Sequence, residues 1–282
     1  MKFILPVALI VVVLAVFCGY RAIAVMSSDG SSPKINMPED VLQVSVSDPE
    51  SALVNGITAE DKRDGDVTAS IVVESIKLND STGAATVTYA AFDKSGNVAK
   101  ASRQIQYTDY ESPRFTLSKP LAFPQGANFD ILSLIGAEDR LDGDITHRIR
   151  ATPLDDAAIT AYGTHDVEFR VTNSLGETVR LTLPVEIYSA GSYQGTLNLK
   201  QYLVYLNKGD KFDPEDYLDS VTFGSDTTYL RQSIPSGFSY TTEGNVDTDT
   251  PGLYTVDYEV SYSSGYYSSY TAYSKLIVIV EG

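Results

Sequence analysis

Cysteine and histidine are both scarce in this 282-residue sequence. Its single cysteine, Cys18, lies inside an apolar N-terminal segment. One cysteine excludes a framework of internal disulfides, so the folded parts must be held together by hydrophobic cores. The two histidines, His147 and His165, form no paired-histidine metal motif, and the sequence has no nucleophile elbow and no phosphate-binding loop. We therefore expect no catalytic residues, and we expect both histidines at the surface or at a strand edge.

Basic residues are also few. The sequence has 21 Lys and Arg against 37 Asp and Glu, which gives a formal net charge of -16. A nucleic-acid partner would require a basic stripe, so this balance argues against one. Acidity on this scale favours solubility, cation binding or contact with basic surfaces. The hydrophobic content of 43% is ordinary for a globular protein, so each domain can bury a core.

One long apolar run is present, at residues 3–18, and Arg21 follows it. The run fits a signal peptide cleaved after the small residues at 22–24, or an uncleaved signal anchor over residues 1–26. Residues 3–26 make a helix of about 24 residues if Arg21 reaches back to the interface, enough to cross roughly 30 Å of hydrocarbon. Both alternatives export the rest of the chain. We expect a single-pass protein of the cell membrane with an extracellular C-terminal part, or else a secreted protein.

A ten-residue acidic run occurs twice. The sequence AEDKRDGDVT at residues 59–68 returns as AEDRLDGDIT at residues 137–146, 78 positions later. The two copies differ only at Lys62/Arg140, Arg63/Leu141 and Val67/Ile145. This match indicates duplication of one domain of about eighty residues, which is typical of a tandem array.

Alternation of apolar and polar residues dominates the sequence after a polar linker at residues 27–34. Three sets of apolar residues recur with period two: Val87, Tyr89 and Ala91; Val167, Phe169 and Val171; and Tyr254, Val256, Tyr258, Val260 and Tyr262. The first valine of each set lies four residues after a glycine, at Gly83, Gly163 and Gly252, which predicts a turn into a strand with one buried face. We predict an all-β fold of three tandem β-sandwiches at residues 35–109, 110–189 and 194–282, the third diverged.

Three short motifs occur in the part of the sequence after residue 35. Both acidic runs fit the pattern A-x-D-x-x-D-G-D-[IV]-T, residues 93–97 (DKSGN) fit D-x-x-G-N, and residues 252–258 (GLYTVDY) fit G-x-Y-x-V-x-Y. Together they resemble the bacterial immunoglobulin-like domains of surface and secreted proteins, the type also found in pesticidal crystal proteins. The second domain departs from the pattern at Asn173, and the third lacks the acidic run. The resemblance implies immunoglobulin-like sandwiches that serve as spacers, stalks or adhesive modules, and it implies no catalytic activity.

The acidic runs are candidate calcium sites. Calcium takes about six to eight oxygen ligands, and each run gathers several carboxylates, at Asp61, Asp64, Asp66 and Glu60, and at Asp139, Asp142, Asp144 and Glu138. Asp93 would complete the first site if its loop lies at the same end of the sandwich, whereas Asn173 would weaken the second site. An EF-hand is excluded, because Lys62 and Ile71 would occupy ligand positions.

The alternative to calcium is a plain tight turn. In that case Gly65 and Gly143 would take positive φ, the aspartates would accept hydrogen bonds from backbone N–H groups, and the neighbouring basic residues would offset charge. The sequence leaves both alternatives open.

Tyrosines are concentrated in the serine-rich stretch SYSSGYYSSYTAY. Tyrosine offers a rigid ring with a polar tip, which suits recognition of a glycan or a protein. The other interpretation is a hairpin in which some of these rings fill the core and others cover the sheet. The candidate ligand-binding residues are Tyr262, Tyr266, Tyr267, Tyr270 and Tyr273.

These observations favour a non-enzymatic bacterial cell-surface protein whose domains act as a stalk and as an adhesive unit. Its partner would be a cell-wall glycan or a protein, with the membrane contacted through the N-terminal helix and no nucleic acid bound. The alternative function is an extracytoplasmic docking subunit of a membrane complex. No cofactor is expected, apart from calcium if the acidic runs bind it.

Overall fold

The computed structural model describes residues 30–154, 160–230, 236–263 and 269–282. All regular structure in these residues is β-strand or short 3-10 helix, which confirms the all-β fold class. The chain divides into two compact units, Met1–Tyr110 and Glu111–Gly282, called unit 1 and unit 2.

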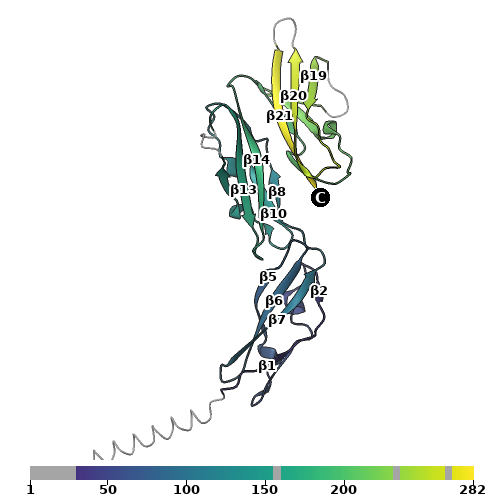
Figure 1. Cartoon of the computed structure of the whole chain (residues 1–282). Helices are drawn as coiled ribbons and strands as arrows, with labels where there is room; N and C mark the ends of the chain where they lie inside the picture. Colours follow the sequence, from purple (N-terminus) through teal and green to yellow (C-terminus); the bar gives the residue numbers. More distant parts are fainter. Residues whose placement is uncertain (1–29, 155–159, 231–235, 264–268) are drawn as a thin grey trace, which may run out of the picture. The chain divides into compact units, whose positions relative to one another are not determined.

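The described part of unit 1, residues 30–110, forms two sheets (Figure 1). The larger sheet has the strand order β2–β7–β6–β5, with bounds Leu42–Val44, Val98–Tyr107, Ala84–Phe92 and Val72–Leu78. The smaller sheet has the order β1–β3–β4, with bounds Lys34–Asn36, Thr58–Asp61 and Gly65–Asp66. Ala59 of the smaller sheet and Ala91 of the larger one are both 0% exposed and share one hydrophobic cluster, so the two sheets pack face to face.

The first half of unit 2 repeats this plan with β8 to β14. Its larger sheet has the order β9–β14–β13–β12, with bounds Ala122–Pro124, Thr178–Tyr188, Gly163–Thr172 and Arg150–Pro153. Its smaller sheet has the order β8–β10–β11, with bounds Arg114–Leu117, Ile135–Asp139 and Gly143–Asp144. In both larger sheets a short first strand pairs in parallel with the long last strand, β2 with β7 and β9 with β14. The two copies of the acidic run therefore occupy equivalent places.

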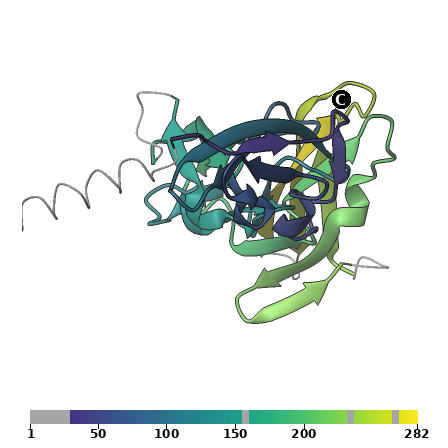
Figure 2. The same ribbon diagram turned by 90° about the horizontal axis from the view of Figure 1, so that it is seen from below.

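The second half of unit 2, β15 to β21, keeps the four-strand order but joins all its strands into one sheet. The run β16–β21–β20–β19 has the bounds Leu203–Asn207, Ser269–Glu281, Gly252–Ser263 and Phe238–Glu243. The remaining strands β15, β17 and β18 have the bounds Gly195–Leu199, Leu218–Phe223 and Asp226–Tyr229. Strand β15 also pairs in parallel with β21, which connects the two sets. The β17–β18 hairpin forms the edge of this seven-stranded sheet, drawn in light green in Figure 2.

The inward faces predicted from period-two alternation are buried. Val87, Tyr89 and Ala91 are 0% exposed, and the corresponding residues of β13 and β20 are at most 1% exposed. Tyr254 and Tyr262, at the ends of the third set, are only partly buried. One hydrophobic cluster runs through unit 2 from the β8–β14 half into the β15–β21 half, so the two halves share a core.

The turn glycines agree with prediction at two of three positions. Gly83 and Gly163 have φ of 89° and 125°, whereas Gly252 begins β20 without a positive φ. A Cβ atom at Gly83 would lie 2.7 Å from Tyr110 Cβ and 2.9 Å from the Tyr107 carbonyl oxygen. Position 83 therefore requires glycine for both conformation and space.

The predicted localisation is contradicted. The residues that the structure describes contain no helix long and apolar enough to cross a membrane. Their helices are 3-10 turns of three or four residues, and the remaining regular backbone is paired between strands. The expected anchor or signal helix at residues 1–26 lies outside the described residues. A single-pass location in the cell membrane, with the membrane as a partner, is thus a prediction that the structure overturns.

Candidate functional site

The first acidic turn connects β3 to β4, where Asp61 lies opposite Gly65. Asp61 Oδ1 accepts hydrogen bonds from the backbone N–H groups of Arg63 and Asp64, at 2.8 and 2.9 Å. Gly65 has φ of 74°, as the tight turn requires. These contacts form the turn that the sequence suggests, and they use only one oxygen of Asp61.

Asp66 has a separate role in the same turn. Its Oδ1 accepts a hydrogen bond from the Thr68 backbone N–H at 2.9 Å. The Thr68 side chain and backbone N–H hold the pKa of this exposed carboxyl below its usual value. In the second turn Asp144 bonds Thr146 in the same way at 2.9 Å, and its pKa is lowered for the same reason. Both aspartates therefore stabilise the turn.

The loop between β6 and β7 lies against the first acidic turn. The backbone N–H of Lys94 donates to Asp64 Oδ2 at 2.8 Å, which ties the two loops together. Asp93 in this loop accepts hydrogen bonds from the backbone N–H and the side-chain amide of Asn97, at 2.7 and 2.6 Å. Burial raises the pKa of Asp93, but these Asn97 hydrogen bonds and further backbone ones outweigh it and leave the pKa below its usual value.

This contact brings three carboxylates together. Asp61, Asp64 and Asp93 each offer an oxygen, and these oxygens all lie within 4.8 Å of one another. Asp61 and Asp93 are 5% and 7% exposed, and the Asp64 side chain is 13% exposed. Lys94 Nζ lies 4.0 Å from Asp64 Oδ1, at the end of a side chain that is 80% exposed. Asp66 does not join the group.

The second acidic turn has the same backbone contacts. Asp139 Oδ1 accepts from the N–H groups of Leu141 and Asp142, at 2.9 and 2.8 Å. However, Asp139 Oδ2 accepts a hydrogen bond from the Asn173 amide at 3.1 Å. Asn173 Oδ1 in turn accepts from the backbone N–H of Glu177 at 3.0 Å.

Asp142 is also fully engaged within the protein. Its Oδ2 lies 2.6 Å from a guanidinium nitrogen of Arg148, and Ser174 donates to both of its oxygens. Burial raises the pKa of Asp142, but the Ser174 hydrogen bonds and Arg148 outweigh it and hold the pKa below its usual value. Of the seven aspartates predicted as calcium ligands, the structure thus brings together Asp61, Asp64 and Asp93 only.

The three predicted tyrosines that the structure describes lie in two places. Tyr262 and Tyr270 lie with Phe223 and Phe238 around a cavity of about 450 Å³, with the Tyr262 and Phe238 ring centroids 4.5 Å apart. Tyr270 is 39% exposed. Tyr266 and Tyr267 lie outside the described residues.

Tyr273 belongs instead to the junction between the two halves of unit 2. Its hydroxyl oxygen lies 2.9 Å from Glu186 and 2.5 Å from Asp257. Burial and the adjacent carboxylates raise its pKa. Lys275 Nζ lies between the same two carboxylates, at 2.7 and 3.3 Å. Lys275 directly precedes the apolar run LIVIV in β21. A lysine beside such a run is the signal that could have pointed to this buried network.

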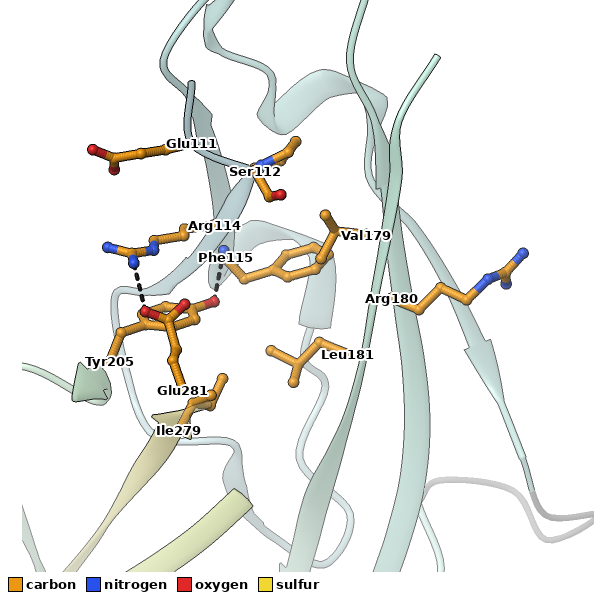
Figure 3. A pocket seen from close by; sticks show the side chains of 11 residues that line it. Glu111, Ser112, Arg114, Phe115, Val179, Arg180, Leu181, Tyr205, Ile279 and Glu281 are labelled. Atoms are coloured by element: carbon orange, nitrogen blue, oxygen red, sulfur yellow. Dashed lines mark hydrogen bonds and ion pairs between the residues drawn. The ribbon is translucent and has the colours of Figure 1, made fainter. Parts of the chain in front are cut away.

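A second set of junction contacts was not predicted from sequence (Figure 3). Arg114 forms an ion pair with Glu281 at 2.6 Å, and its guanidinium carbon lies 5.1 Å from the Tyr205 ring centroid. The Tyr205 hydroxyl accepts a hydrogen bond from the Phe115 backbone N–H at 3.0 Å, and burial raises its pKa. These side chains line a cavity of about 310 Å³. No local motif marks them, because they come from strands far apart in the sequence.

One histidine prediction needs correction. His165 is 5% exposed, and its Nε2 lies 2.8 Å from the Ala161 carbonyl oxygen. Its position in the long strand β13, paired with β14, explains the burial. His147 lies in the 3-10 turn Thr146–Arg148 after the second acidic turn.

Comparison with known proteins places the chain among repeated β-domain proteins. No family model matches it. It is 27% identical over 215 residues to the pesticidal crystal protein Cry22Aa of Bacillus thuringiensis, a match covering 73% of this chain and 27% of that protein. It is also 29% identical over 132 residues to an uncharacterized 81.3 kDa protein of Acholeplasma phage L2, covering 47% of this chain and 16% of that protein. The chain thus spans about a quarter or less of these relatives, and the similarity supports a repeated β-domain without specifying an immunoglobulin-like family.

Solved structures give weaker likenesses. A Clostridium perfringens ZmpB structure, containing CBM51-2 in complex with GlcNAc and INT domains, matches with a TM-score of 0.23 and 15% identity over 88% of this chain and 44% of that one. Human CDH23 EC21-23 matches with a TM-score of 0.21 and 12% identity over 88% of this chain and 100% of that one. At these TM-scores the likenesses support no conclusion about function.

Proposed function

We propose that the protein is a non-enzymatic array of three immunoglobulin-like sandwiches, at residues 35–109, 110–189 and 194–282, which acts as a stalk and binds a glycan. The strand orders β2–β7–β6–β5, β9–β14–β13–β12 and β16–β21–β20–β19 support the domain count, because each has the same parallel pairing of its short first strand. This shared pairing persists in the third domain, which lacks the acidic run.

The junction within unit 2 supports the stalk role. The buried Lys275 and its two carboxylate partners, together with the shared hydrophobic core, join the second and third domains. A buried charge that lost its partners would carry a large desolvation cost, so bending at this junction is opposed. Two domains held in this way behave as one stiff element.

The aromatic cavity beside β17 and β20 is the observation that carries the binding role. Phe223, Phe238, Tyr262 and Tyr270 line it, and Gln194 and Asp226 add polar groups at its wall. Flat rings beside polar groups suit a sugar, which presents both an apolar ring face and hydroxyl groups. This lining favours a glycan over a docked protein, which would require a large exposed apolar patch.

Cosedimentation of the full chain with purified bacterial peptidoglycan tests this proposal. We expect Tyr262→Ala and Tyr270→Ala each to lower the bound fraction at least about fivefold, because each removes a ring that lines the cavity. Tyr162→Ala is the matched control, since Tyr162 is 69% exposed and lies outside the cavity. Absence of binding by the unsubstituted protein, or equal binding by all four proteins, would contradict the glycan role.

A further inference from the structure

The carboxylates of Asp61, Asp64 and Asp93 have the spacing of ligands to one cation. Oxygen atoms bound to the same calcium ion lie about 2.3–2.6 Å from it and so are at most about 5 Å apart. The three candidate oxygens lie within 4.8 Å of one another. They come from two loops that the Lys94–Asp64 hydrogen bond already holds together, so the ligands are positioned before a cation arrives.

A second observation points to a missing positive partner. Asp61 is 5% exposed, and its Oδ2 is buried with no hydrogen-bond partner among the described residues. Buried carboxylate oxygens ordinarily have hydrogen-bond donors, ion-pair partners or metal ions as neighbours, because an unpaired buried charge is costly. The Asp61 carboxylate lies beside those of Asp64 and Asp93, which are also acidic and can donate no hydrogen bond when ionised.

In the second acidic turn, the protein's own side chains pair with the carboxylates that correspond to Asp61 and Asp64. There Asn173, at the position of Asp93, donates an N–H to Asp139 Oδ2. Arg148, at the position of Ser70, forms the ion pair with Asp142. The second turn therefore supplies a donor and a positive charge from its own side chains, whereas the first turn has an additional carboxylate and a serine.

We propose that the first acidic turn binds one calcium ion through Asp61, Asp64 and Asp93, and that the second turn has replaced this ion with Asn173 and Arg148. The ligands are all oxygens, which excludes preference for a soft metal. Calcium fits better than magnesium, because the site lies on two surface loops with an irregular ligand set, and magnesium demands near-ideal octahedral geometry. Water and backbone carbonyl groups would complete the coordination.

Thermal unfolding of the chelator-treated full chain, with and without millimolar CaCl₂, tests the assignment. We expect calcium to raise the melting temperature of one transition by at least about 4 °C. Asp93→Asn, which copies the second turn, is expected to abolish this rise while still folding, because its amide can donate to Asp61 Oδ2 as Asn173 does to Asp139. Asp66→Asn is the matched control in the same turn and should keep the rise.

A reverse exchange provides a test that does not depend on the stability of Asp93→Asn. Asn173→Asp combined with Arg148→Ser recreates the first turn in the second domain, and we expect this protein to bind two calcium ions in a calorimetric titration. A single bound ion in the exchanged protein would overturn the account of the second turn. Equal calcium shifts for Asp93→Asn and the unsubstituted protein would overturn the site itself, as would tighter binding of MgCl₂ than of CaCl₂.

Discussion

The two acidic turns have nearly the same sequence and the same backbone hydrogen bonds, yet their charges are balanced differently. Asp61 and Asp139 each use Oδ1 to accept two backbone N–H groups. The difference lies at Oδ2, which is paired with Asn173 in the second turn and has no hydrogen-bond partner in the first. Identity within the run thus preserves the turn, while residues outside the run decide what the turn can bind.

Two positions outside the run account for the contrast. Asp93 and Asn173 occupy equivalent places in the loops that follow β6 and β13, and Ser70 and Arg148 occupy equivalent places after the two runs. One pair changes a carboxylate into a donor, and the other adds a cation. Both changes move the second turn from excess negative charge toward internal neutrality, which removes the need for an external cation.

The largest expected effect comes from breaking the internal pairing of the second turn. Asn173→Asp would place a carboxylate against Asp139 Oδ2 inside a buried site. We expect the free energy of unfolding to fall by at least about 2 kcal/mol in the absence of calcium, because a donor is lost and a like charge is gained. Urea unfolding at neutral pH measures this change, and a loss below about 0.5 kcal/mol would refute the pairing argument.

The reciprocal substitution should have the opposite sign. Asp93→Asn gives Asp61 Oδ2 a donor and removes one of three close carboxylates. We expect the chelator-treated variant to be more stable than the unsubstituted protein by about 1 kcal/mol, the usual worth of a hydrogen bond. The same urea experiment measures it, and a clear decrease in stability without calcium would show that the carboxylates do not repel one another.

Substitution of the turn glycines should affect the two turns equally. Gly65 and Gly143 have φ of 74° and 70°, and a Cβ atom at either position would have no neighbour within 4 Å. Alanine at either position should cost about 1 kcal/mol through backbone strain alone. Costs that differ by more than about 0.5 kcal/mol between Gly65→Ala and Gly143→Ala would mean that the two backbones are less alike than the structure shows.

The smallest effect concerns the pH dependence of the second turn. The pKa of Asp142 is lowered, so its stabilising contribution is complete above the ordinary value of 3.8 and is lost as pH falls through the lower pKa of the folded state. Arg148→Ala should move that pKa back toward 3.8 and cost less than about 1 kcal/mol at neutral pH, since Arg148 is partly exposed. Melting curves from pH 7 to pH 2 should converge for variant and unsubstituted protein at the acid end. A difference that persists there would assign Arg148 a role other than pairing Asp142.

The sequence was sufficient to predict the strands with one buried face. Val87, Tyr89 and Ala91 alternate with polar residues, and period two has a direct physical meaning because successive side chains point to opposite sides of a strand. The turns at Gly65 and Gly143 were predictable for a similar reason, since positive φ strongly favours glycine.

The candidate cation site was only partly predictable. The sequence names Asp93 as a ligand on condition that its loop reaches the acidic run, and only the packing of the two loops shows that it does. It also includes Asp66 and Asp144, which lie on the exposed side of their turns and bond threonine instead. A lysine in an apolar strand marks the junction around Lys275, but its partners Glu186 and Asp257 could not be predicted, because they come from separate strands.

A calorimetric titration of the chelator-treated full chain with CaCl₂ tests the central claim most directly. The difference between the turns predicts one calcium ion for each chain, bound at the first turn, with the heat of binding absent in Asp93→Asn. Two ions would show that the second turn is open despite Asn173 and Arg148. No bound ion would show that the three carboxylates of the first turn form a plain turn, as the second turn does.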